Sequence, residues 1–362
     1  MGKEYFDFDE KQRANSKNFA VPIGDIYRRE FKNSRQTCHN PGFVGVLLRE
    51  SLMKNYRRRA AGFYFLLLSV SFFVIHSTAK AGTPVAMIYH ERLIFLKMRI
   101  NERHEALFLL DTGASASAID RKTAEKLKLL INGSDKVEGT AGVIEVGKTM
   151  VKSLSLNNAK VNALTVPTYD LSGVLAPPGM ALDGILGFDF LKHFMVRIDY
   201  ESETIEFLSS RRKNDETLLA VPIALDNGIP KLSVVLDDSI PTDLRLDTGA
   251  SLFQTPDIYL NITERVWNEL TNLDSALKPE KYFTGSGVGG TVKLPVSRIK
   301  KMAVGELVFG APFVIVQPKA GYFARNDAVG FISNNFLEKF GAVILDYPAR
   351  TLYLKRITSG AR

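Results

Sequence analysis

The sequence contains two copies of one five-residue motif, and the residues before each copy also correspond. Asp111-Thr112-Gly113-Ala114-Ser115 recurs as Asp247-Thr248-Gly249-Ala250-Ser251, 136 residues later. At that offset the preceding apolar residues align without a gap: Val85 with Val221, Leu96 with Leu232, Ile100 with Leu236 and Leu110 with Leu246. A repeat of this length predicts a chain built from two similar halves.

The correspondence continues after the motif. Gly184-Ile185-Leu186-Gly187 corresponds to Gly330-Phe331-Ile332-Ser333, and Arg197-Ile198-Asp199-Tyr200 to Ile344-Leu345-Asp346-Tyr347. We therefore expect one half over residues 83–210 and the other over 219–355. A polar linker is expected over residues 211–218 and a tail over 356–362.

Both halves are predicted to be mostly β. Short apolar runs bounded by turn residues indicate strands over 106–110, 143–146, 231–236 and 342–345. Asp120 and Thr263 are expected to cap short helices over 121–129 and 264–273. Because strands and helices do not alternate, a doubly wound parallel sheet is not expected. The predicted fold class is all-β.

The repeated motif suggests a chemistry. Asp111 follows an apolar run, so its carboxylate is expected at the end of a buried strand, where it needs a partner. One Asp-Thr-Gly turn is commonplace, but a twofold relation between the halves would bring Asp111 and Asp247 face to face. Two adjacent carboxyl groups share one proton, so one can take a proton from water while the other donates to a carbonyl. Such a pair can hydrolyse an amide.

On these residues and on Ile185-Leu186-Gly187, the chain resembles the aspartic protease clan, and most closely retropepsin-like bacterial proteases with two lobes in one chain. The resemblance implies two closed β-barrel lobes related by a pseudo-twofold axis, with an active-site cleft between them. It also implies that Asp111 and Asp247 are the catalytic dyad. The sharing of one proton by such a dyad is a known property of this clan, carried over here.

The resemblance assigns supporting roles as well. Thr112 and Thr248 would form a hydrogen-bonded grip between the lobes, with Gly113 and Gly249 beside the dyad. Ala114 and Ala250 match the retropepsin form, which lacks one hydrogen bond near the dyad and implies activity at mildly acidic pH. The sequence departs from the clan at Ser333, where the second lobe should carry glycine; we expect the small serine to be tolerated.

Two glycine-rich segments match the sequence patterns of nucleotide-binding motifs. Residues 142–149 match the P-loop pattern and residues 285–290 the dinucleotide pattern, but neither is followed by a helical segment. Both lie where this clan places its flap, a hairpin over the cleft, which makes Gly139, Gly142, Gly285 and Gly287 flap candidates. The alternatives are plain hairpin turns or nucleotide binding.

Leu109 and Arg245 are the candidates for substrate pockets. Each lies two residues before its aspartate and therefore on the same face of the strand. By the resemblance, this position helps to line the pockets beside the scissile bond, where Arg245 would favour an acidic substrate residue. The alternative is that Arg245 pairs with Asp243 and only stabilises the strand.

The N-terminal segment predicts export. Arg57-Arg58-Arg59, the uncharged residues 60–79 and the sequence Ala79-Lys80-Ala81 have the order of a secretory signal. Residues 53–81 are thus expected to be a signal peptide, or an uncleaved anchor holding the protein to the membrane through 60–79. We expect synthesis to start at Met53, residues 1–52 to be a non-native or disordered extension, and the mature protein to be periplasmic or extracellular.

Composition narrows the function. Residues 1–81 hold 14 Lys and Arg against 7 Asp and Glu, whereas the remainder holds 33 against 32, so no nucleic-acid partner is expected. Cys38 is the only cysteine, and the histidines lack metal-ligand spacing, which predicts no metal and no other cofactor. The function predicted is a monomeric aspartic endopeptidase acting on peptides or proteins. The alternative is a catalytically inactive peptide-binding module with the same fold.

Overall fold

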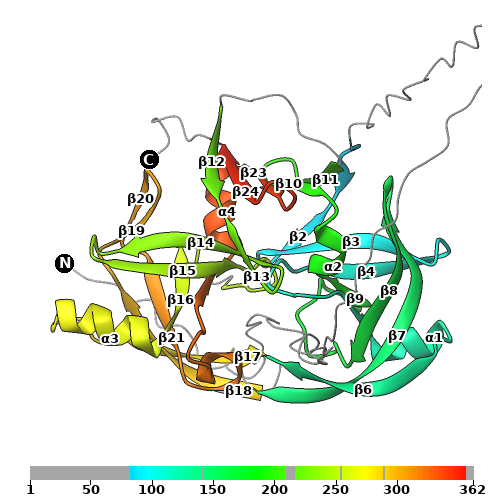
Figure 1. Cartoon of the computed structure of the whole chain (residues 1–362), viewed down its shortest axis with the longest axis horizontal. Coiled ribbons are helices and arrows are strands. Elements are labelled where there is room, and N and C mark those ends of the chain that lie inside the picture. The colour runs from blue at the N-terminus through cyan, green and yellow to red at the C-terminus, as the bar shows by residue number, and fades with distance from the viewer. Residues whose placement is uncertain (1–81, 140–141, 209–216, 253–254, 288–289, 356–362) are drawn as a thin grey trace, which may run out of the picture. The chain divides into compact units, whose positions relative to one another are not determined.

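The computed structural model describes residues 82–139, 142–208, 217–252, 255–287 and 290–355, and these are mostly strands (Figure 1). The all-β prediction is confirmed. The expectations for residues 1–81, for residues 211–216 of the predicted linker and for the tail 356–362 lie outside the described residues. The linker was predicted to extend to 218, but Leu218 already begins strand β12 (Leu218–Pro222). Among the described residues, no helix has the length and hydropathy needed to cross a membrane.

The first sheet is built from the first half of the chain. Its strand order is β2 (Ile88–His90), β3 (Leu93–Ile100), β4 (His104–Leu110), β9 (Gly184–Leu186), β5 (Ala118–Asp120), β8 (Ala159–Tyr169), β7 (Val143–Leu156) and β6 (Ile131–Glu138). Strand β3 also pairs with β7, which brings the two sides of the sheet together. Strand β4 runs parallel to β9, with Leu109 opposite Ile185.

The second sheet is built from the second half. Its order is β17 (Lys281–Gly287), β18 (Gly290–Arg298), β21 (Phe313–Gln317), β16 (Tyr259–Thr263), β22 (Gly330–Ile332), β15 (Ile240–Leu246), β14 (Ile229–Leu236), β19 (Lys301–Val304) and β20 (Leu307–Gly310), with β13 (Ala224–Asp226) paired to β14. Strand β15 runs parallel to β22, with Arg245 opposite Phe331. This pairing corresponds to that of β4 with β9 in the first sheet.

A third sheet joins the halves. Its order is β1 (Val85–Ala86), β11 (Thr204–Leu208), β10 (Met195–Asp199), β23 (Ala342–Asp346), β24 (Thr351–Lys355) and β12 (Leu218–Pro222). The central pair β10–β23 links one half to the other, with Met195 opposite Asp346. The repeated segments around Asp199 and Asp346 therefore pair with each other.

The helices are short. Helix α1 (Arg121–Lys126) is capped by Asp120, which accepts a hydrogen bond from the Thr123 amide, and α3 (Glu264–Leu273) is capped by Thr263 in the same way. The α3 prediction is confirmed. The predicted α1 is three residues too long, because the chain reverses at Lys128, whose φ of 54° is incompatible with a helix. The remaining elements are α2 (Phe188–Leu191), α4 (Asn334–Leu337), η2 (Gly321–Ala324) and η3 (Glu338–Phe340).

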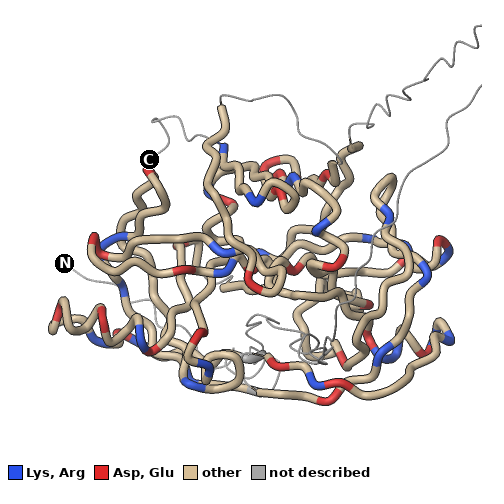
Figure 2. Tube along the Cα trace, in the orientation of Figure 1, with Lys and Arg blue, Asp and Glu red and all other residues tan. Residues whose placement is uncertain are grey.

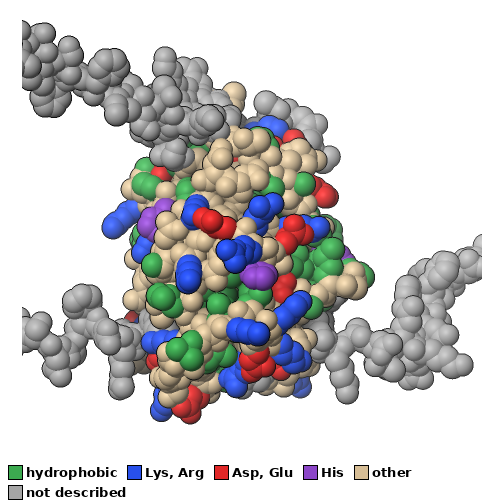
Figure 3. All heavy atoms as spheres, turned by 90° about the vertical axis from the view of Figure 1, so that its right-hand side faces the viewer, with side chains coloured by type: hydrophobic (Ala, Val, Ile, Leu, Met, Phe, Trp, Pro, Cys, Tyr) green, Lys and Arg blue, Asp and Glu red, His purple; other side chains and the backbone are tan. Residues whose placement is uncertain are grey.

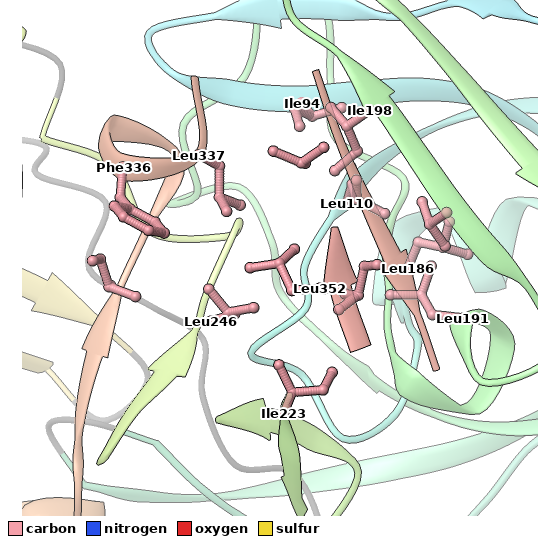
Figure 4. Close-up of a cluster of buried hydrophobic side chains, with 14 of the residues drawn as sticks. Ile94, Leu110, Leu186, Leu191, Ile198, Ile223, Leu246, Phe336, Leu337 and Leu352 are labelled. Atoms are coloured by element: carbon pink, nitrogen blue, oxygen red, sulfur yellow. The ribbon is translucent and has the colours of Figure 1, made fainter. Parts of the chain in front are cut away.

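One apolar cluster extends through both halves beneath the repeated motif (Figure 4). Leu110 and Leu246, the residues immediately before Asp111 and Asp247, both belong to it and are at most 1% exposed. Leu352 of the third sheet lies between them in the view. Because the two strand ends are packed into one core, the loops that follow them are held at a fixed separation.

Charged residues of both signs are interspersed along the chain (Figure 2). On the face shown in Figure 3, lysine and arginine side chains are spread across the surface with aspartate and glutamate side chains among them. An interspersed surface of this kind produces a weak long-range field.

Candidate active site

The two aspartates lie at the ends of equivalent strands in the two halves. Asp111 follows β4, and its amide donates to the Leu186 carbonyl of β9 at 3.0 Å. Asp247 follows β15, and its amide donates to the Ile332 carbonyl of β22 at 2.9 Å. The parallel strand that follows in each half thus holds the backbone of each aspartate.

The two threonines form a reciprocal hydrogen-bond network. The Thr112 hydroxyl donates to the Leu246 carbonyl and the Thr248 hydroxyl donates to the Leu110 carbonyl, both at 2.8 Å. Each hydroxyl also accepts from the other threonine's amide at 3.1 Å. All four bonds are buried and cross between the halves, so they fix the two loops against each other.

The glycines of the motif allow the aspartates to face each other. A Cβ atom on Gly113 would lie 2.6 Å from the carboxyl carbon of Asp247, and one on Gly249 would lie 2.4 Å from that of Asp111. No side chain fits at these distances. Each glycine is therefore required because the carboxyl group of the opposite half lies against it.

The two carboxyl groups are buried and close enough to interact directly. Asp111 is 0% and Asp247 3% exposed. Oδ1 of Asp111 accepts from the Gly113 amide at 2.8 Å, and Oδ1 of Asp247 from the Gly249 amide at 3.0 Å. Oδ2 of Asp111 is buried and accepts no hydrogen bond from the described residues.

Burial raises both pKa values. Burial, together with the negative charge of Asp247, raises the pKa of Asp111 well above its usual range. Burial raises the pKa of Asp247 to about 7, against hydrogen bonds from Gly249 and Asp111 and the charge of Arg245, which lower it. Near neutral pH the pair therefore holds at least one proton, the state needed for acid and base to act together.

Two buried tyrosines lie near the pair and were not predicted from sequence. Tyr347 is close enough to Asp111 for the carboxylate charge to disfavour ionisation of the phenol. Tyr259 is affected in the same way by Asp247. Burial raises the pKa of both phenols, so they stay neutral. Tyr347 could have been noticed in the sequence, because the repeat aligns it with Tyr200. The alignment does not indicate that Tyr347 lies near Asp111.

The structure explains why Ser333 replaces glycine. A Cβ on Gly187 would lie 2.5 Å from the Ala116 carbonyl oxygen, so the first half needs glycine there. Both residues have extended backbones, with φ of −110° at Gly187 and −128° at Ser333, so conformation alone does not demand glycine. In the second half Ser333 is accommodated in full burial beside Tyr259.

The flap candidates lie in or beside paired strands, and neither glycine-rich segment opens the helix that a nucleotide-binding motif requires. Residues 143–149 of the P-loop-like segment lie in strand β7, and residues 285–287 and 290 of the dinucleotide-like segment lie in β17 and β18. Hairpin β6–β7 turns between Gly139 and Gly142, whose amide–carbonyl bond is 2.7 Å. In β17–β18, Gly285 lies opposite Val292 and Gly287 opposite Gly290.

The β6–β7 hairpin contacts the second half. The Gly139 carbonyl accepts from the Tyr322 amide of η2 at 3.0 Å, and Glu138 lies 3.8 Å from the Arg325 guanidinium. The hairpin is therefore joined to the second half by a hydrogen bond and an ion pair.

The two pocket candidates are both covered. Leu109 is 0% exposed within an apolar cluster that includes Phe95 and Ala114. Arg245 is 4% exposed. The alternative pairing expected for Arg245 is wrong: its guanidinium donates to Asp226 at 2.7 Å, whereas Asp243 pairs with Lys231. The sequence did not reveal Asp226, because the β13–β14 hairpin brings it to Arg245 from 19 residues away.

Comparison with known proteins gives one result. A family model described as aspartyl protease matches residues 96–190, which include Asp111-Thr112-Gly113 and Gly187 but not Asp247. No curated protein is significantly similar to the chain. The second aspartate therefore rests on the repeat and on the geometry of the pair, while the match supports a hydrolase of the aspartyl protease type.

Proposed function

We propose that residues 83–355 form an aspartic endopeptidase with Asp111 and Asp247 as its dyad. The observation that carries the proposal is the buried pair of carboxyl groups, each placed by an equivalent strand end and each lying against the motif glycine of the other half. A buried carboxyl pair destabilises the ionised forms, and a fold without a use for it would gain stability from apolar residues instead. The intact pair also argues for catalysis over peptide binding alone.

The proposed reaction needs only this pair and a water molecule. The ionised carboxylate takes a proton from water while the water oxygen bonds to the peptide carbonyl carbon. The protonated carboxyl gives its proton to the carbonyl oxygen, which produces a gem-diol. The carboxyl that took the proton of water then gives it to the amide nitrogen, while the other carboxylate takes a proton from a diol hydroxyl. The C–N bond breaks, an acid and an amine are released, and the dyad returns to its starting protonation state. No covalent bond to the enzyme forms.

The test is cleavage of a mixed peptide library by purified 82–362 and by Asp111→Asn and Asp247→Asn. Because the two carboxyls act as one unit, each variant should lose at least ~1,000-fold in kcat/KM, and the double variant should lose little more. Asp170→Asn, at an exposed carboxylate, is the control and should keep parental activity. Substantial cleavage by either dyad variant would contradict the proposal.

We also propose that the protein is exported through residues 53–81, either cleaved after Ala81 or anchored by 60–79. The order of basic, apolar and small residues supports this. N-terminal sequencing of the protein recovered outside the cytoplasm should begin at Gly82, or include residues 53–81 if the anchor is retained. Recovery of a cytoplasmic chain that begins at Met1 would contradict it.

A further inference from the structure

The two halves of the site differ in charge at one position, two residues before each aspartate. Strand β4 carries the buried Leu109 there, whereas β15 carries Arg245. Since residues two apart on a strand share a face, each side chain accompanies its aspartate. A cation therefore lies beside Asp247, and an apolar side chain lies at the matching place beside Asp111.

Arg245 is held from two sides. Its Nη2 donates to Oδ2 of Asp226 at 2.7 Å, and its Cζ lies 4.0 Å from the centroid of the Tyr322 ring. A guanidinium that is paired and stacked is oriented and shielded from water. With 4% of the residue exposed, it offers little surface to a substrate carboxylate. Its charge acts inward, on Asp247.

Resting on the proposed protease function, we infer that Arg245 is a positioning residue that keeps the negative charge of the dyad on Asp247. Asp247 is then the base that takes the proton of water, and Asp111 is the acid that gives its proton to the carbonyl oxygen. The proton balance is that of the proposed reaction. Each aspartate accepts an equivalent hydrogen bond from the amide of its own motif glycine. Arg245 breaks this symmetry by favouring the ionised form of Asp247.

The charged and titratable groups near the two carboxyls also favour a negative charge on Asp247. Asp247 faces Asp111, Arg245 and the neutral Tyr259, while Asp111 faces Asp247 and the neutral Tyr347. Arg245 is among the causes that lower the pKa of Asp247, whereas burial and then the charge of Asp247 raise that of Asp111.

One further charge moderates the effect of Arg245, and a second is neutralised by its own partner. Asp226 offsets part of the guanidinium charge through the ion pair. Lys231 lies opposite Arg245 in the β14–β15 ladder, but its ammonium pairs with Asp243 at 3.0 Å. We therefore expect Arg245 to lower the pKa of Asp247 by about one unit or less, at the low end of what a nearby opposite charge produces.

The test is the pH dependence of kcat/KM. Arg245→Leu places the residue of the first half, Leu109, at the matching position. Because the positive charge is lost, the acidic limb of the pH profile of kcat/KM should move about 0.5 to 1 unit to higher pH. Arg245→Lys should leave the limb near its parental position. Asp226→Asn, which leaves the guanidinium charge uncompensated, should move it to lower pH. Lys231→Gln removes an equal charge from the same sheet and is the matched control, with no shift expected.

An unmoved limb in a folded Arg245→Leu protein overturns the inference while leaving the protease proposal intact. If that variant does not fold, Asp226→Asn decides, because a limb that stays in place or moves upward contradicts the assignment. Carboxyl ¹³C NMR titration of Asp247, assigned by comparison with Asp247→Asn, gives a readout that does not depend on cleavage. An unaltered titration of Asp247 in Arg245→Leu overturns the inference even for a protein that cleaves nothing.

Discussion

Thr112 and Thr248 each donate a hydroxyl hydrogen bond to the carbonyl that precedes the other's aspartate, at 2.8 Å in both directions. The residues that flank the two carboxyls in sequence are thus bonded across the halves. The separation of the carboxyls is set by backbone and threonine, not by the carboxyls themselves, whose charges would drive them apart.

Removal of either hydroxyl should loosen this connection. Thr112→Val and Thr248→Val keep the side-chain shape but leave a buried carbonyl and a buried amide without partners. Each should lower the free energy of unfolding by about 1 to 3 kcal/mol, measured by urea denaturation. Because the residues are in contact, the loss in the double variant should differ from the sum of the two.

A suitable control is Thr271→Val in helix α3. The Thr271 hydroxyl bonds only to the Asn268 carbonyl within its own helix, at an exposed site. Its loss should change the unfolding free energy by less than about 0.5 kcal/mol. An equal effect at all three positions would show that the cross-half bonds contribute nothing specific.

Gly249→Ala should disrupt the dyad. The added methyl group would lie 2.4 Å from the Asp111 carboxyl carbon, so the carboxyl must move. We expect kcat/KM to fall by at least ~100-fold, since displacement of a reacting group by about 1 Å has that effect. Gly173→Ala is the control, because no atom lies within 4 Å of a Cβ at that position. Full activity of Gly249→Ala would contradict the face-to-face arrangement.

The buried pair should make the protein less stable as the pH rises. The folded-state pKa values of Asp111 and Asp247 are both raised, so their stabilising contribution is complete below the unfolded pKa, near 4. It declines as the pH rises through the folded value of Asp247, about 7. Between pH 4.5 and 7.5 we expect a loss of about 2 to 4 kcal/mol in the free energy of unfolding.

The double variant Asp111→Asn/Asp247→Asn isolates this contribution. It lacks both titrating groups, whereas Asp189, whose pKa burial also raises, remains in both proteins. The variant should therefore lose less stability than the parent over the same pH range, as measured by urea denaturation. Parallel pH profiles for the two proteins would contradict the shared-proton arrangement.

An exchange of residues tests the asymmetry between Gly187 and Ser333. Gly187→Ser places a Cβ 2.5 Å from the Ala116 carbonyl and should cost about 2 kcal/mol or more. Ser333→Gly introduces no clash and should cost about 1 kcal/mol or less. Comparison of the two midpoints in thermal unfolding settles the matter, and equal losses would show that the close approach at Ala116 relaxes freely.

The sequence by itself determined the repeat, the strand-rich character and the pair of aspartates. Asp111 and Asp247 were identified because a local motif occurs twice at one offset, and local patterns survive in sequence. The caps at Asp120 and Thr263 were identified for the same reason, since a cap depends on residues three apart.

The tertiary structure alone decided how the two halves of the site differ. The Asp226 partner of Arg245, the Tyr322 ring over it and the tyrosine beside Asp111 come from separate segments, and their meeting depends on strand register and hairpin placement. The need for glycine at Gly187 but not at Ser333 depends on how closely Ala116 approaches. Contacts between distant segments are fixed by packing, to which no local pattern in the chain corresponds.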